Sequence, residues 1–375
     1  MINIKYETKC VLGRHLDDIS EYSRTPVIMG NTRTGDGYNY SRTRNFNTEQ
    51  LENHIALLYD QKNAVVAQTT VALYEIFFDI LESRGIKEII VPRFPYEEIL
   101  IHTKRRKDFD EVHYIDFVDI HQLYDILQQG KAYGIIFDTP VNPSLDDINL
   151  REVHDIVKAS CGDSIICVDN TLRTSYFCNP FEEGEADVVI ESLTKASSGH
   201  GDCFGGVMIF NSSFSEPDIN DIRKNMYQRG VRISPFDAYL IQRGISTLAI
   251  RMDRMNRNRQ ILFDELSKRF KRVKTVDNSS MILLSVTDNP YFHREMLDKL
   301  KIITVGMSCG QDDTIVTCLW DNEDHWQHLG EFRESIRISV GIEDPEDILE
   351  DILQAYRRAY RQYENKEELE RFKIG

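Results

Sequence analysis

The sequence predicts an α/β fold, with a large domain built on a mostly parallel sheet and a smaller C-terminal α+β domain. Its 375 residues are enough for a large core and two domains. Short apolar segments alternate with segments of helical periodicity, a pattern typical of parallel strands joined by covering helices. A long helical segment, 234–270, then leads into a second group of apolar segments. In such folds ligands bind at the carboxyl ends of the parallel strands.

The first elements are predicted from spacing and capping residues. The segment 1–47 is polar and irregular, and a helix capped by Asn47 or Thr48 is expected to follow it. Strands are predicted at 88–91, 112–115, 134–137, 164–168, 187–190 and 206–210. Helices are predicted between them, for example at 70–83 and 147–159.

The C-terminal part is predicted to begin with the segment 234–270 and to break near Gly244. Further strands are expected near 280–286, 302–306, 314–318 and 335–340. A closing helix is expected with Asp344 as its cap and Pro345 in its first turn. The expected domain limits are 1–47 for an N-terminal arm, 48–235 for the large domain, and 236–375 for the long helix and the small domain.

Composition narrows the class of function. A net charge of −16 argues against nucleic acid or an anionic membrane as partner, because both require basic surface. The seven cysteines show no C-x-x-C spacing, and reduced thiols are the simplest interpretation. The start lacks the apolar core of a signal peptide, and no apolar run approaches the roughly 20 residues of a membrane span. We therefore expect a cytoplasmic protein. No metal site is expected, since HWQH offers only His325 and His328.

One lysine stands in unusual surroundings. Lys195 follows the predicted strand VVI in "VVIESLTKASSGHGDCFGG", beside the hydroxyls of Ser192 and Thr194. A Ser-x-x-Lys acylation site is one interpretation, but the companion S-D-N and K-T-G motifs are absent from the sequence. The other interpretation is a lysine that forms a Schiff base with pyridoxal phosphate.

Pyridoxal phosphate also requires a carboxylate for its pyridine nitrogen and donors for its phosphate. Asp169 ends the predicted strand SIICV and precedes Lys195 by 26 residues. If these two strands are adjacent and parallel, Asp169 and Lys195 reach the same edge of the sheet. That arrangement favours the cofactor interpretation of the lysine.

The stretch "VDNTLRTSYFCNPFEEGEADVVIESLTKASSGHGDCFGGVMI" resembles the core of the cystathionine synthase and lyase family, the pyridoxal-phosphate enzymes of cysteine and methionine metabolism that include methionine γ-lyase. The resemblance continues in "GYNYSRTRNFNTEQLE", "DTPVNPSLDDINL", "SPFDAYLIQRGISTLAIRMDR" and "IRISVGIEDPEDILEDI". It implies the fold-type I architecture with a seven-stranded sheet in its large domain.

The resemblance also implies roles for individual residues. Lys195 would carry the cofactor and shuttle protons, Asp169 would pair with the pyridine nitrogen, and Tyr96 would stack on the ring and help release the leaving group. The remaining cofactor contacts would come from Ser192, Thr194, Thr69, Thr70 and Asn142. Tyr40 and Arg42 would reach the phosphate of a neighbouring subunit, which implies a homodimer or homotetramer with shared sites. Arg337 and Ser308 would bind the substrate carboxylate.

The implied activity is β- or γ-elimination from a substituted amino acid, typically at a C–S bond of a cystathionine-, methionine- or cysteine-like substrate. Two alternatives remain: γ-replacement, as in a transsulfuration synthase, and a non-catalytic assembly protein that keeps the fold. The chain departs from the family at "AQTTVALYEI", where Thr69 and Thr70 stand in place of glycine and methionine, and at the substrate wall "TCLWDNEDHWQHL". The substrate itself is therefore left open.

Overall fold

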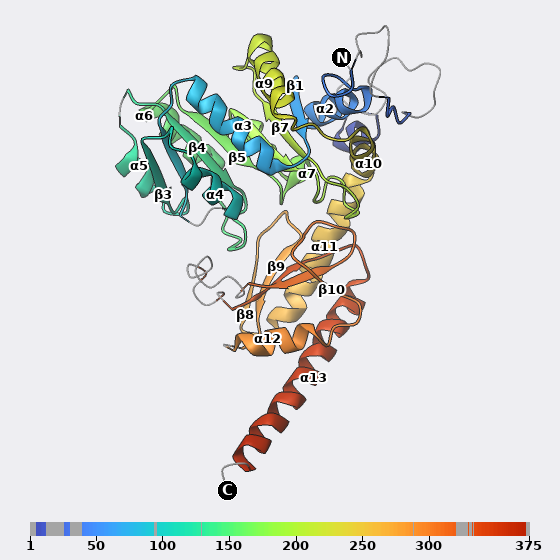
Figure 1. The fold of residues 1–375 in the computed structure, drawn as a ribbon. Helices are drawn as coiled ribbons and strands as arrows, with labels where there is room; N and C mark the ends of the chain where they lie inside the picture. The colour runs from blue at the N-terminus through green and yellow to red at the C-terminus, as the bar shows by residue number, and fades with distance from the viewer. Residues whose placement is uncertain are drawn as a thin grey trace. The chain divides into compact units, whose positions relative to one another are not determined.

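The computed structural model shows a chain that folds as two compact units (Figure 1). The description covers residues 5–12, 26–30, 40–93, 96–128, 130–287, 289–319, 329, 332 and 334–372. The first unit comprises residues 1–142 and 146–250, and the second comprises 143–145 and 251–375. The chain passes from the first unit to the second inside one helix, α11 (Leu248–Ser267). The domain limits expected from the sequence stay a prediction.

The first unit contains a seven-stranded sheet in the order β1-β7-β6-β5-β4-β2-β3. The strands are β1 Asn63–Ala67, β2 Glu88–Pro92, β3 Glu111–Ile115, β4 Tyr133–Asp138, β5 Ile165–Asp169, β6 Val188–Ser192 and β7 Gly206–Phe210. Only β7 runs antiparallel to its neighbours, so the sheet is mostly parallel, as predicted. The six predicted strands are confirmed. β1 is an addition at the edge of the sheet.

Helices cover the sheet on both faces. Those of the first unit are α1 Tyr6–Leu12, α2 Phe46–Leu58, α3 Thr70–Ser83, α4 Glu97–Arg105, α5 His121–Ile126, α6 Leu150–Ser160, α7 Thr174–Phe177, α8 Pro180–Glu183, α9 Glu216–Arg229 and α10 Pro235–Ile245. The helices α3 and α9 lie on one face and share a core with alternate residues of the strands, such as Ile136, Cys167 and Ile190 (Figure 1). The residues between them, such as Val168 and Val189, are buried as well. Because both faces of these strands are buried, their sequences are continuous runs of apolar residues.

Two predicted helix starts are corrected by the caps. The helix α2 begins at Phe46, and its cap is Asn45, whose side chain accepts hydrogen bonds from the backbone N–H groups of Asn47 and Thr48. The predicted caps Asn47 and Thr48 therefore lie inside the first turn. The helix predicted at 147–159 begins three residues later, at Leu150, after its cap Asn149. In both places several side chains that can cap a helix lie close together in the sequence, Asn and Thr before α2 and Asp and Asn before α6, and spacing alone did not choose among them.

The second unit has a five-stranded sheet in the order β10-β11-β12-β9-β8. Its elements are β8 Arg272–Thr275, β9 Met281–Ser285, α12 Pro290–Leu297, β10 Thr304–Val305, β11 Ile315–Cys318, β12 Ile336–Ser339 and α13 Pro345–Phe372. The four predicted strands and the closing helix at Pro345 are confirmed, and β8 and α12 are additions. Apolar residues of α11, α12 and α13 pack on this sheet.

Two general properties complete the fold. All seven cysteines are free thiols, and six of them are buried. Within the described ranges, no helix combines the length and the apolar character needed to cross a membrane.

Candidate active site

The carboxyl edge of the first sheet brings together the residues that the sequence singled out. Asp169 is the last residue of β5, and it pairs with Asp138, the last residue of β4, and with Ile190 of β6. Two residues beyond Ile190, β6 ends at Ser192, and the turn with Lys195 follows directly. Because β4, β5 and β6 run parallel, all these residues lie at one edge of the sheet. The predicted adjacency of the two strands that end in Asp169 and precede Lys195 is confirmed.

Asp169 is a buried acid held by two donors. It is 7% exposed. Its Oδ1 accepts a hydrogen bond from the backbone N–H of Thr171 at 2.9 Å, and its Oδ2 accepts one from the hydroxyl of Tyr74 on α3. Burial raises the pKa of Asp169, whereas the bonds from Thr171 and Tyr74 lower it. Both donors favour the carboxylate form, which is the form able to pair with a cation.

Asp138 is a second buried acid that the sequence reasoning missed. It is 8% exposed, and its Oδ2 accepts the backbone N–H of Asn142 at 2.7 Å. Burial raises the pKa of Asp138 to about 7, and the neighbouring Asp169 adds to the rise. The half-buried Asn142, predicted to lie near the cofactor's ring oxygen, thus anchors this acid through its backbone.

The turn after β6 is fixed by short-range hydrogen bonds. The backbone N–H of Lys195 donates to the carbonyl of Ser192 at 3.1 Å. The hydroxyl of Thr194 donates to the carbonyl of Gly205 at 3.2 Å and accepts the N–H of the same residue at 3.0 Å. The hydroxyl of Ser198 donates to the carbonyls of Thr194 and Lys195. The half-buried side chain of Lys195 therefore stands on a tightly held backbone.

A third buried acid, Glu191, lies beneath this turn. Its carboxylate accepts hydrogen bonds from the hydroxyls of Ser197 and Tyr59. Tyr59 in turn accepts the side-chain N–H of Asn170 at 3.1 Å. Burial raises the pKa of Glu191 to about 7. An acid inside the apolar strand VVIES was a visible signal in the sequence, but its partners come from distant segments.

Glu191 is expected to make the stability of the cofactor-free protein depend on pH. The pKa of Glu191 in the folded state, about 7, lies above its value of 4.5 in the unfolded chain. The contribution of Glu191 to the free energy of unfolding is therefore fully present below pH 4.5 and is lost as the pH rises toward 7. The free energy of unfolding should fall by about 1.4 kcal/mol per pH unit from this group. Urea melts of Glu191→Gln, compared with wild type at about pH 5 and about pH 7, should show that slope removed. An unchanged slope would contradict the assignment.

The N-terminus of α3 faces the same edge. Thr69 caps this helix, and its hydroxyl accepts the N–H of Ala72 at 3.3 Å. Gly206, paired with Ser192 in the sheet, lies so close that an added Cβ would stand 2.7 Å from the backbone nitrogen of Thr70. The first turn of α3 therefore lies directly beside the end of β6. Free N–H groups at a helix N-terminus favour an anion such as phosphate.

Gly206→Ala is expected to push the start of α3 away from β7, because the neighbours of the new methyl group are backbone atoms that cannot rotate aside. We expect a loss of about 1–3 kcal/mol in the free energy of unfolding, together with weaker cofactor binding. Gly162→Ala is the matched control, since a Cβ added at Gly162 would stand 4.0 Å from its nearest neighbour, the backbone oxygen of Lys158. Equal free energies of unfolding for the two variants in urea melts would contradict the importance of the close approach between Gly206 and the start of α3.

Tyr96 precedes α4 and is 41% exposed. Its ring centroid lies 6.4 Å from that of Tyr74, with the rings tilted by 54°. The hydroxyl of Tyr74 also donates a hydrogen bond to Asp169, so Tyr96, Tyr74 and Asp169 form one cluster of side chains. Tyr74 was not predicted as a site residue, and only the packing of α3 on the sheet places its hydroxyl on the acid.

The other predicted residues lie elsewhere in the chain. Tyr40 and Arg42 are exposed, and the Arg42 guanidinium lies 4.5 Å from the ring centroid of Tyr227 on α9. In the second unit, the buried Arg337 of β12 donates to the carbonyl of Met307 at 3.3 Å, next to Ser308. His325 and His328 lie outside the described residues.

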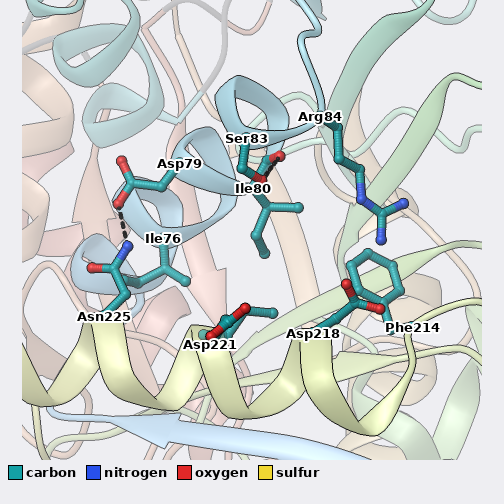
Figure 2. A pocket seen from close by; sticks show the side chains of 10 residues that line it. Ile76, Asp79, Ile80, Ser83, Arg84, Phe214, Asp218, Asp221 and Asn225 are labelled. Atoms are coloured by element: carbon teal, nitrogen blue, oxygen red, sulfur yellow. Dashed lines mark hydrogen bonds between the residues drawn. The ribbon is translucent and has the colours of Figure 1, made fainter.

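Two further clusters lie away from this edge. A cavity of about 190 Å³ between α3 and α9 is lined by Asp79, Asp218 and Asp221 together with Arg84 (Figure 2). Glu88, Glu111 and His113 gather where β2 and β3 begin, the opposite ends of the strands from Asp138 and Asp169. Lys131 pairs with Glu88 there, so a cation already neutralises the buried acid of the group.

Comparison with known proteins identifies the family of the chain and its cofactor. A family model described as Cys/Met metabolism PLP-dependent enzyme matches residues 15–357. This chain belongs to that family. Its cofactor is therefore pyridoxal phosphate, and the chain is an enzyme of the cystathionine type. The recognition made from the sequence motifs is confirmed.

Relatives of this Cys/Met metabolism enzyme include named lyases. It is 26% identical over 342 residues to an L-methionine γ-lyase of Fusobacterium nucleatum subsp. polymorphum, with 84% of each chain covered. It is 30% identical over 260 residues to a cystathionine β-lyase of Lactococcus lactis subsp. cremoris, with 62% of this chain and 67% of the relative covered. These matches support pyridoxal-phosphate-dependent β- or γ-elimination.

A solved structure confirms the fold of the enzyme. The crystal structure of metB from Corynebacterium glutamicum superimposes with a TM-score of 0.84 at 25% identity, covering 95% of this chain and 98% of that one. The fold-type I prediction is confirmed. The carboxyl edge fits the cofactor: α3 offers N–H groups beside Gly206, Asp169 offers a buried acid, and Lys195 offers an amine.

Proposed function

We propose that this enzyme eliminates a β- or γ-substituent from an amino acid, with Lys195 carrying the cofactor and Asp169 pairing with its ring nitrogen. The observation that supports this most is the placement of the buried Asp169 and the Lys195 turn at the ends of adjacent parallel strands. Bound pyridoxal phosphate supplies a ring that accepts negative charge from the α-carbon of the substrate.

Lys195 takes the α-proton of the substrate onto Nζ and later returns a proton. The hydrogen bonds of its turn hold the backbone, so the amine is presented from a fixed point. Asp169 keeps the ring nitrogen protonated, because Thr171 and Tyr74 stabilise its carboxylate form. The substituent would leave with the electrons of its bond to carbon and take up a proton, and one water would then hydrolyse the remainder to a 2-keto acid and ammonia.

The remaining cofactor contacts follow from the same edge. The first turn of α3, with Thr69 and Thr70, and the hydroxyls of Ser192 and Thr194 would hold the phosphate, and Thr194 would do so by turning its hydroxyl hydrogen away from the carbonyl of Gly205. Tyr96 stacks on the ring, and its place beside Tyr74 supports this role. Asn142 contacts the ring oxygen.

Arg337 binds the α-carboxylate of the substrate, aided by Ser308. A guanidinium presents two parallel donors that fit a carboxylate. The position of Arg337 supports this role, because its contact with the carbonyl of Met307 places the buried guanidinium beside Ser308. The leaving group is most typically a sulfur substituent, as the names of the relatives suggest.

The enzyme acts in the cytoplasm as a homodimer or homotetramer whose sites are shared between subunits. Tyr40 and Arg42 are exposed in the single chain, which leaves them available to reach a neighbour's phosphate. Subunits of Arg42→Ala and Lys195→Ala, each weak or inactive alone, should regain part of the activity when mixed. In such a mixture one of the two sites of a dimer has both residues intact. Mixed subunits with no recovery would contradict the shared site.

The elimination is tested by incubating the loaded enzyme with methionine, cystathionine and cysteine, with and without an added thiol, and measuring keto acid release. Release from at least one substrate without the thiol is the expected result. Products formed only when the thiol is added would show γ-replacement instead. Absence of any reaction across a wider panel of substituted amino acids would contradict the proposal.

A further inference from the structure

Asp138 and Asp169 form a pair of acids at the end of two neighbouring strands. They occupy partner positions in the register of β4 and β5, so their side chains leave the sheet on the same face. Both are at least nine-tenths buried, at 8% and 7% exposed. The mechanism above uses only Asp169. The second acid therefore has no assigned task.

The hydrogen bonds of the pair are unequal. Asp169 receives one donor on each oxygen, from Thr171 and Tyr74. Asp138 receives the backbone N–H of Asn142 on Oδ2, but no described residue gives its buried Oδ1 a partner. A buried carboxylate oxygen without a donor is costly when charged. The negative charge of the pair is therefore stabilised at Asp169 and disfavoured at Asp138.

Among the described residues, few other ionisable groups face Asp138. Asp169 faces it from β5, and the hydroxyl of Tyr74, which is bonded to Asp169, faces it from α3. The guanidinium of Arg173 reaches Thr139 at 3.4 Å, but it is paired with Asp147 at 2.8 Å. Two adjacent buried carboxylates do not both ionise readily, and the pKa of Asp138, raised to about 7, agrees with one proton held there.

We propose that Asp138 holds a proton in the cofactor-free enzyme and releases it when a protonated ring nitrogen pairs with Asp169. This inference rests on the proposed role of Asp169. The O–H bond of Asp138 breaks, the proton passes to solvent, and the new carboxylate becomes a second counter-charge beside the ring. The cation that neutralises Asp169 removes the repulsion that kept Asp138 protonated. Asp138 is thus a positioning residue that acts through Asp169.

The release makes cofactor affinity depend on pH. Between the pKa of Asp138 in the loaded enzyme and its higher pKa in the cofactor-free enzyme, wild type should bind pyridoxal phosphate about tenfold more tightly for each unit rise in pH, relative to Asp138→Asn. The asparagine keeps the shape of the acid but has no proton to release. Calorimetry in two buffers of different protonation enthalpy counts the protons directly. Wild type should release about one proton more than the variant.

Glu191→Gln is the matched control, because Glu191 is also buried with a pKa of about 7 but points to the other face, toward Tyr59. It should release nearly as many protons as wild type. Equal proton release by Asp138→Asn and wild type would overturn the proposal. So would a loss in Glu191→Gln as large as that in Asp138→Asn.

Infrared spectroscopy keeps the proposal testable if Asp138→Asn fails to fold. The spectra are recorded in the Glu191→Gln background, which removes the other buried carboxyl whose pKa is raised to about 7. The difference spectrum between the loaded and the cofactor-free enzyme should show the loss of a carbonyl band of a protonated, buried carboxyl. A difference spectrum without that loss contradicts the release. Failure of the proposed function is recognised separately, because the cofactor would then not be found on Lys195 when it is fixed by reduction.

Discussion

The Lys195→Ala variant is expected to lose all measurable turnover while keeping its fold. Alanine has no amine to carry the cofactor or to move the α-proton. The backbone bonds of the turn, such as Lys195 N–H to Ser192, do not involve the side chain and should persist. Keto acid release measures turnover, and circular dichroism with a urea melt measures the fold.

Lys224→Ala is the control for this variant, because Lys224 is exposed on α9. It should retain wild-type turnover and stability. Full turnover in Lys195→Ala would contradict the assignment of the cofactor lysine. Loss of the fold in that variant would show instead that the side chain has a structural role.

Asp169→Asn should lower kcat by about 10²–10³-fold, the effect typical of removing one preorganised electrostatic partner from an active site. The amide has nearly the same shape, but it carries no charge to hold the ring nitrogen protonated. Its NH₂ group also faces a donor, either Thr171 N–H or the Tyr74 hydroxyl. Steady-state kinetics on a substrate found in the panel, together with cofactor affinity, measures the loss.

The exposed Asp221 on α9 gives a matched control, since Asp221→Asn removes the same charge far along the chain from β5. Its kcat should equal that of wild type. If Asp169→Asn retained wild-type kcat, the carboxylate would not be the partner of the ring.

The alternation of apolar strands and helices predicted the first unit because its strands are buried on both faces. Lys195 and Asp169 were predictable for the same reason, since each follows or ends an apolar run in the sequence. Asp138 ends its strand in the same way, but its place beside Asp169 follows from the register between β4 and β5, which the sequence does not show. Glu191 likewise acquires its role from Tyr59, which precedes it by 132 positions.

The second unit was less predictable in its details. The strand β8 is only half-buried along its length, so its residues RVKT carry little apolar signal. The helix α12 spans eight residues and is capped by Asn289 ahead of a proline, a pattern that also occurs in loops. Arg337 was predictable only through the family motif, because a buried arginine in a strand has no periodic signature of its own.

Reduction of the loaded enzyme with borohydride, followed by peptide mass mapping, tests the central claim most directly. The treatment fixes the cofactor covalently to the amine that carries it. The peptide that contains Lys195 should gain the mass of the reduced cofactor, and no other lysine peptide should gain it in comparable yield. The cofactor mass on a different lysine, with the Lys195 peptide unmodified, would contradict the claim.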